Sequence, residues 1–264
     1  MHIKSEIKDS VLIWQLNRPD RRNALGPILA EELWVKVNEL TKNLSTWPDP
    51  AQAPRLLAIK ALSDMGDKDP IWIAGGDLRE LSELKNSIDG RNYAKRMAEV
   101  CQALQTLPIP VVALIDGLVI GGGIEFALAA DLRFATKRSR FHFKQLELGL
   151  STAYASAGRL THLVGASRAM NWLLRSSTLT ARAAWDAGLI TELVDSERGL
   201  EKELLRLRDD IVPLNPASVT AQKQLFTLHS SNPRTESELD IFESLWMNDF
   251  HQESLRKFLR PKGK

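Results

Sequence analysis

The residues best suited to chemistry are three consecutive glycines, Gly121 to Gly123, followed by one acid, Glu125, inside an apolar helix-like run. A helix N-terminus presents backbone N–H groups that have no partner within the helix, and glycine lets those groups approach a ligand closely. Such a site can stabilise an oxyanion. An acid one turn along can exchange a proton with the carbon beside that oxyanion. The stretch therefore suits chemistry that passes through an enolate.

A second glycine corner lies upstream, in the sequence IAGGDL at residues 73–78. Gly75 and Gly76 follow a short apolar element, and a helix is predicted to begin near Asp77, an acid well suited to a helix N-terminus. If the two corners meet, they supply two converging N–H donors.

Two phosphate-binding motifs fail on spacing. A dinucleotide-binding loop requires G-x-G-x-x-G, but Phe126 stands where the third glycine belongs. A Walker loop requires a lysine directly after its last glycine, and the next lysine is Lys137. A purely structural alternative stays open: a tight strand-to-helix corner, in which Glu125 is a first-turn acid facing the positive end of the helix.

The composition limits the class of protein. The chain has 264 residues and 44% apolar residues, which is ordinary for a globular domain. Its formal net charge of +2 gives no strong electrostatic attraction to nucleic acid or to a membrane surface. The single cysteine, Cys101, fits a reducing compartment and is expected in the core. The N-terminus does not resemble a signal peptide, and no apolar run reaches the ~20 residues of a membrane span. A cytoplasmic protein without a metal site is expected.

Strand and helix signals alternate over residues 1–195, which predicts an α/β core, and helices dominate residues 196–264. The predicted strands are 11–17, 55–62, 71–74, 111–117, one or two within 132–143, and 190–195. The predicted helices are 26–44, one from about 77, 93–107, the run after Gly123, 156–177, 180–189, and most of the chain after 197.

Five segments together resemble the enoyl-CoA hydratase/isomerase (crotonase) superfamily. They are LNRPDRRNAL (16–25), IAGGDLREL (73–81), IPVVALIDGLVIGGGIEFALAADLRFA (109–135), LGL…GRLTHLVG (148–165) and LTARAAWDAGLITELVD (179–195). They cover about 180 residues in the order that the family keeps. Any one of them alone would be a weak signal.

The resemblance implies a spiral of ββα units over residues 1–195 and a C-terminal helical trimerisation region over 196–264, with trimers often paired into hexamers. It implies an acyl-CoA thioester substrate, with coenzyme A as part of that substrate and no permanently bound cofactor. The family's two oxyanion amides match Gly76 and Gly122, and Glu125 matches one of the two hydratase acids.

The resemblance also places the coenzyme A moiety along two segments. The expected contacts are Arg22, Ala24, Leu25, Ala74, Asp77, Leu78 and Arg79. Guanidinium groups suit phosphates, so Arg18, Arg21, Arg22 and Arg79 are candidate phosphate partners, although any one of them equally fits a solvated surface charge.

The sequence departs from the family pattern at the second hydratase acid. That acid normally lies four residues before the glycine of LGL, where this chain has Gln145, and Lys144 occupies the usual proline position. Glu147 is two residues too late and would need a local rearrangement to substitute. The following segment, STAYASAG (151–158), replaces most of the family's proline and glycines.

Hydration needs two proton operations, and an amide is not a useful general base. A single acid can still move a double bond, although the family's isomerases commonly keep their acid at the position of Gln145. The resemblance nevertheless implies an enoyl-CoA hydratase or isomerase. Another enolate reaction on a CoA ester, such as thioester hydrolysis or decarboxylation, and a non-catalytic acyl-CoA-binding protein stay open.

Overall fold

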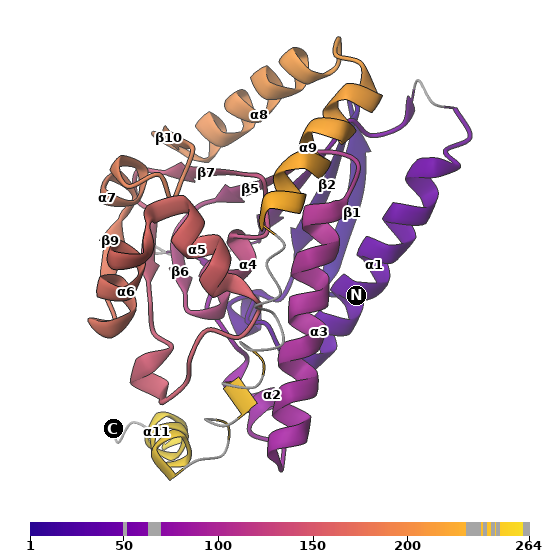
Figure 1. Cartoon of the computed structure of the whole chain (residues 1–264). Coiled ribbons are helices and arrows are strands. Elements are labelled where there is room, and N and C mark those ends of the chain that lie inside the picture. Colours follow the sequence, from indigo (N-terminus) through magenta and orange to yellow (C-terminus); the bar gives the residue numbers. More distant parts are fainter. Residues whose placement is uncertain are drawn as a thin grey trace.

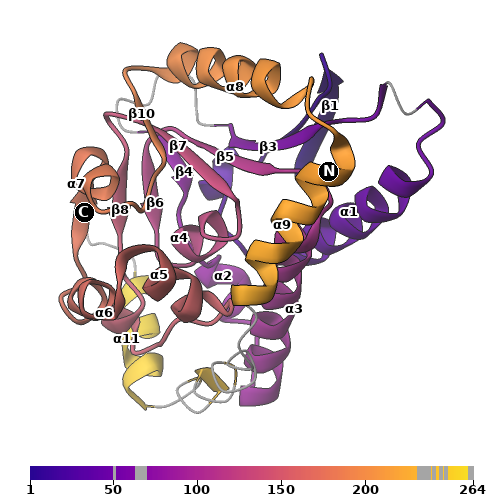
Figure 2. The ribbon, with the colours of Figure 1, turned by 45° about the horizontal axis from the view of Figure 1, so that its top comes forward.

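The computed structural model describes residues 1–49, 52–62, 70–230, 239, 242–243, 246 and 249–260. Within these residues the strands form a six-stranded sheet in the order β1-β2-β3-β5-β7-β10 and a four-stranded sheet in the order β4-β6-β8-β9. Pairing is parallel except for β1 with β2 and β8 with β9. Figures 1 and 2 show the two sheets surrounded by helices.

From β3 to β8, successive strands alternate between the two sheets, and this alternation produces the spiral. The larger sheet contains β1 (Ile3–Lys8), β2 (Val11–Leu16), β3 (Leu56–Ala61), β5 (Val111–Ile115), β7 (Leu132–Thr136) and β10 (Glu192–Val194). The smaller sheet contains β4 (Ile71–Ile73), β6 (Leu118–Ile120), β8 (Arg140–His142) and β9 (Thr178–Thr180). The predicted α/β spiral of ββα units is confirmed.

Helices follow the strand pairs and cover the sheets. They are α1 (Pro27–Ser45), α2 (Leu78–Leu81), α3 (Ser87–Thr106), α4 (Gly122–Ala127), α5 (Ser156–Val164), α6 (Ala166–Leu174) and α7 (Ala181–Asp186). In α3 the Asn86 side chain caps the N-terminus by accepting the Asp89 N–H at 2.9 Å. Its buried face includes Tyr93, Met97 and the predicted core cysteine, Cys101.

Three strands, β1, β6 and β9, were not predicted from the sequence. In β1 only Ile3 is buried, because the strand lies at the edge of the larger sheet and has no apolar run to reveal it. Strands β6 and β9 have three residues each, which is too short for a periodic pattern. Strand β6 matters most, because it carries the chain from the β5 turn to the three glycines.

The C-terminal part is helical where the structure describes it. Helix α8 (Glu197–Ile211) lies along β7 and β10, and α9 (Pro216–Ser230) packs beside α3 (Figure 1). Helix α11 (Asp249–Leu259) lies apart from both, against the short 3-10 helix Leu146–Leu148. No helix in the described ranges combines the length and apolarity needed to cross a membrane. A trimerisation role for residues 196–264 stays a prediction, and part of that region lies outside the described residues.

Candidate active site

The three glycines form the corner between β6 and α4. Gly121 has φ 47° and ψ −113°, in the left-handed half of backbone space that glycine tolerates best, and its N–H donates to the His142 carbonyl at 2.9 Å. Gly122 then begins α4. Because no side chain caps this helix, its first amides remain available to a ligand.

The upstream corner, at Gly75 and Gly76, is built differently; in chain order it is the first corner, and the corner at Gly121 to Gly123 is the second. Gly75 has φ 91°, and the carboxylate of Asp77 caps α2 by accepting the N–H groups of Arg79 and Glu80 at 3.2 and 3.3 Å. Leu25 pairs with Gly76 in a parallel bridge, donating to the Gly75 carbonyl at 2.7 Å and accepting from the Asp77 N–H at 2.8 Å. Because Leu25 hydrogen-bonds to the residues on either side of Gly76, the Gly76 N–H points away from Leu25.

The two corners meet. A Cβ atom added at Gly75 would lie 3.7 Å from the Gly122 nitrogen and 3.0 Å from the Ile120 carbonyl oxygen. Among the described residues, the amides of Gly76 and Gly122 donate no hydrogen bond to another protein group. Both residues line the same pocket. The expected pair of oxyanion donors is therefore brought together at one place.

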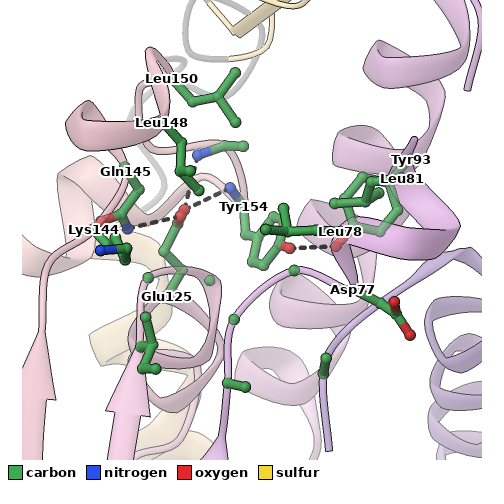
Figure 3. Close-up of a pocket in the computed structure, with 18 of the residues that line it drawn as sticks. Asp77, Leu78, Leu81, Tyr93, Glu125, Lys144, Gln145, Leu148, Leu150 and Tyr154 are labelled. Atoms are coloured by element: carbon green, nitrogen blue, oxygen red, sulfur yellow. Dashed lines mark hydrogen bonds between the residues drawn. The ribbon is translucent and has the colours of Figure 1, made fainter. Parts of the chain in front are cut away.

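Glu125 points from α4 into this pocket and is 3% exposed (Figure 3). Its Oε2 accepts the N–H groups of Ala153 and Tyr154 at 2.8 and 3.0 Å and the Ser156 hydroxyl at 2.7 Å. Among the residues that the structure describes, its Oε1 accepts a single hydrogen bond, from the Gln145 amide at 3.0 Å. One oxygen is therefore anchored by three donors, whereas the other retains a lone pair that can act on a ligand.

Gln145, at the position of the missing second acid, is buried and lines the pocket. Its amide nitrogen faces Glu125, which is the orientation that an acceptor-only carboxylate requires. Its Oε1 has no hydrogen-bond partner among the described residues. The structure thus joins the two positions at which the resemblance leads us to expect acids, as one carboxylate and one amide.

Glu147 lies outside the pocket lining. Its carboxylate pairs with the Lys144 ammonium and lies 3.3 Å from the His142 ring nitrogen. The hydrogen bond from Lys144 lowers the pKa of Glu147. Glu147 therefore does not replace the second acid in this arrangement, whereas Lys144 does line the pocket.

The pocket has a volume of about 540 Å³, within the usual range for a small-molecule site. Its lining includes six of the seven residues expected to contact coenzyme A: Arg22, Ala24, Ala74, Asp77, Leu78 and Arg79. Within the described part of the chain, the guanidinium groups of Arg22 and Arg79 have no ion-pair or hydrogen-bond partner. Both remain available for phosphates.

Two of the expected contacts are placed elsewhere. Leu25 is fully buried in the core and is not a lining residue, because its backbone bridges to Gly76. Arg18, a candidate phosphate partner, is 5% exposed and forms ion pairs with Asp77 at 3.2 Å and Glu80 at 2.5 Å. It holds α2 in place instead of facing a ligand. The carboxylate of Asp77 is likewise occupied by the helix cap and by Arg18.

Sequence reasoning missed several lining residues. Tyr93 and Tyr154 were hidden in an amphipathic helix and in an unusual segment, and Phe242, Trp246 and Phe258 come from the C-terminal part. A helical period reports which face of a helix is buried, but not whether that face borders a ligand. The replacement of the family's small residues by STAYASAG was the one signal pointing to Tyr154.

The described residues hold no group of three His, Cys, Asp or Glu side chains arranged for a metal ion.

The chain matches the family model described as enoyl-CoA hydratase/isomerase over residues 59–263. It is 28% identical over 219 residues to a short-chain-enoyl-CoA hydratase from Clostridium acetobutylicum, covering 83% of this chain and 78% of the relative.

A second relative carries out another reaction. The chain is 26% identical over 261 residues to an ethylmalonyl-CoA decarboxylase from Homo sapiens, covering 96% of this chain and 78% of that protein. Among solved structures, an enoyl-CoA hydratase from Bacillus halodurans has a TM-score of 0.85 at 20% identity, over 97% of this chain and 100% of that one, and shows the same fold. The chain therefore belongs to the enoyl-CoA hydratase/isomerase, or crotonase, family of enzymes that act on acyl-CoA thioesters.

Proposed function

We propose that this enzyme forms the enolate of an acyl-CoA thioester between the Gly76 and Gly122 amides, with Glu125 as its single proton-transfer group. The observation that carries the proposal is the Glu125–Gln145 pair, in which one buried carboxylate oxygen is anchored and the other is open to the pocket. The coenzyme A phosphates would lie toward Arg22 and Arg79.

The reaction that this arrangement supports best is migration of a double bond in an enoyl-CoA. Glu125 Oε1 removes a proton from the α-carbon of a 3-enoyl ester, and the electrons move into the thioester carbonyl as the dienolate forms. The same carboxyl then returns a proton to the γ-carbon, which leaves the 2-enoyl ester. One group carries out both transfers, whereas hydration also requires a base for water.

A second candidate is decarboxylation of a malonyl-type CoA ester. Its specific support is the Lys144 side chain, which lines the pocket next to Gln145. The Lys144 ammonium, paired with Glu147 in this structure, would also attract an acyl carboxylate. In this reaction the C–C bond to the carboxylate breaks, carbon dioxide leaves, and the electrons enter the thioester oxygen. Only one proton then has to reach the α-carbon.

The test is product identification with a panel of 2-enoyl, 3-enoyl and malonyl-type CoA esters. We expect interconversion of the 2- and 3-enoyl esters, and a roughly 1,000-fold loss in Glu125→Gln, within the range of general acid–base catalysis. The glutamine oxygen can still accept from Ala153, Tyr154 and Ser156, so the variant should fold and bind the ester. Carbon dioxide release alone would favour the second candidate, and tight binding without turnover would indicate a non-catalytic protein.

Gln145→Glu is the matched variant. It restores the second carboxylate at the position where the amide now lies 3.0 Å from Glu125, so it should add hydration of 2-enoyl-CoA to the wild-type reaction.

We further propose, from the family resemblance, a homotrimer or hexamer in the cytoplasm. Analytical ultracentrifugation tests the assembly, and fractionation of cells that express the protein tests the location.

A further inference from the structure

The chain contains two tyrosines, and both lie in the wall of the pocket with their hydroxyl groups hydrogen-bonded to each other (Figure 3). Tyr93 comes from α3 and Tyr154 from the segment before α5. They are 6% and 4% exposed, and their rings meet edge to face with centroids 6.0 Å apart. Burial raises the pKa of Tyr154 well above its ordinary value, so the phenol keeps its proton.

The direction of this hydrogen-bond chain is fixed by chemistry. The Tyr93 hydroxyl lies 2.8 Å from the Leu25 carbonyl, which can only accept, so the Tyr93 proton points to Leu25. The Tyr154 hydroxyl must then donate to the Tyr93 oxygen. The chain of donors therefore runs from Tyr154 through Tyr93 to the Leu25 backbone.

At its far end this chain reaches the first glycine corner. The Leu25 carbonyl that accepts from Tyr93 also accepts the Asp77 N–H at 2.8 Å, and the Leu25 N–H donates to Gly75 at 2.7 Å. Leu25 is the bridge partner of Gly76. The position of Tyr93 is thus tied to the backbone that presents the Gly76 amide.

At its near end the chain reaches the second corner and the acid. The Tyr154 hydroxyl lies 2.9 Å from the place where a Cβ of Gly122 would be, so it packs directly on the first residue of α4. The Tyr154 backbone N–H donates to Glu125 Oε2 at 3.0 Å. One residue therefore contacts the second oxyanion corner, the proton-transfer group and, through Tyr93, the first corner.

We propose that Tyr154 and Tyr93 are positioning residues that set the spacing between the Gly76 and Gly122 amides. This inference rests on the proposed oxyanion site. Besides the hydroxyl link, the corners are joined by packing and by the pairing of β4 with β6, the strands that lead into them. Both amides must lie within hydrogen-bond distance of a single oxygen. A misplacement of about 1 Å costs on the order of 100-fold in rate.

The experiment compares Tyr93→Phe, Tyr154→Phe and the double variant, each of which keeps the ring and removes the hydroxyl link. The probe is 4-dimethylaminocinnamoyl-CoA, whose absorption moves to longer wavelength when its thioester carbonyl is polarised. We expect a red shift with the wild type, a smaller and similar shift with each single variant, and no further loss in the double variant. For the ester that the panel identifies, kcat should fall roughly 10- to 100-fold while KM changes less than about threefold.

Ser139→Ala is the matched control. It also removes one partner of a buried hydroxyl pair, Thr136 with Ser139 at 3.0 Å, but neither residue lines the pocket. This variant should keep the full red shift and the wild-type kcat. Loss of the shift in the control as well would mean that general destabilisation is responsible, and would overturn the inference.

A measurement on the wild type avoids dependence on folding of the variants. Because the chain has two tyrosines, incorporation of 3-fluorotyrosine gives fluorine signals from this pair alone, and both signals should move when the probe binds. Unchanged signals, or a full red shift in both single variants, would overturn the tyrosine role while leaving the oxyanion site intact. No red shift with the wild type would reject the oxyanion site itself and, with it, this inference.

Discussion

The two sides of the pocket each present a backbone amide, but different interactions hold these amides in place. The first corner, at Gly76, is held by a buried ionic cluster in which Arg18 pairs with Asp77 and Glu80. The second corner, at Gly122, is held by apolar packing and by the hydrogen bonds that anchor the Glu125 carboxylate. The ionic cluster lies behind its corner, whereas the second side leaves its one carboxylate facing the ligand. The charged groups at the first corner therefore stabilise the fold, whereas the carboxylate at the second corner faces the pocket.

The largest expected effect comes from breaking the ionic side. Arg18→Met removes the cation from the buried Asp77 and the half-buried Glu80, which should lower the free energy of unfolding by about 3–5 kcal/mol in a denaturant titration. The triple variant Arg18→Met, Asp77→Asn and Glu80→Gln removes the charges together, and asparagine remains a good helix cap. It should recover most of the loss, and a triple variant as unstable as the single one would refute the ionic account of this corner.

A smaller loss is expected from crowding the packed side. A Cβ at Gly123 would lie 2.8 Å from the Ile73 carbonyl oxygen and 2.9 Å from the Ile73 Cβ, and backbone cannot easily move away. Gly123→Ala should therefore lower the free energy of unfolding by about 1–3 kcal/mol.

The matched control is Gly158→Ala in α5, where an added Cβ meets nothing within 4 Å. Alanine favours a helix over glycine, so this variant should be neutral or slightly more stable. Equal melting temperatures for the two alanine variants would show that α4 is not tightly packed against β4.

The same substitution at the ionic corner should cost less. A Cβ at Gly76 would lie 2.8 Å from the Leu81 Cδ1, the end of a flexible side chain, and 3.9 Å from the nearest backbone oxygen. Gly76→Ala should lower the free energy of unfolding by about 1 kcal/mol or less, because the Leu81 side chain can move to make room for the new methyl group. If thermal unfolding shows a loss as large as that of Gly123→Ala, the contrast between the corners is wrong.

The smallest expected effect is a pH dependence in how firmly α11 docks next to the second corner. The His251 ring of α11 hydrogen-bonds to the Leu148 carbonyl at 2.9 Å, next to Gln145, and burial lowers the pKa of His251 from its ordinary 6.5. The contribution of His251 to docking is therefore present above pH 6.5 and is lost as the pH falls toward the lowered pKa.

Hydrogen exchange of α11 should accordingly be a few-fold faster at pH 5.5 than at pH 7.5, after correction for intrinsic rates. His251→Asn keeps a donor near Leu148 but cannot titrate in this range, so its exchange should not depend on pH in this way. An equal dependence in both proteins would assign the effect to other groups of α11.

The sequence predicted most of the spiral because its buried strands, such as those within 55–62 and 111–117, are mainly apolar runs with turn signals at their ends. It also predicted Gly76, Gly122 and Glu125 as candidate site residues, which the structure places around one pocket, because glycines before a helix and an acid in an apolar run are local features. It could not place Arg18, whose partners lie some 60 residues away, or the Tyr93–Tyr154 contact, which likewise joins distant segments. Phe242 and Trp246 reach the pocket from the far end of the chain. Local patterns report exposure and period, but only the fold reports which distant side chains meet.

Enolate formation is the most direct test of the site, and it can be measured without knowing the product. The enzyme is incubated with butyryl-CoA in deuterium oxide, and α-deuterium incorporation is followed by mass spectrometry. The wild type should exchange the α-protons, Gln145→Glu should retain the exchange, and Glu125→Gln should lose it while still binding the ester. Exchange by Glu125→Gln at the wild-type rate would contradict the assignment of Glu125 as the group that moves the proton.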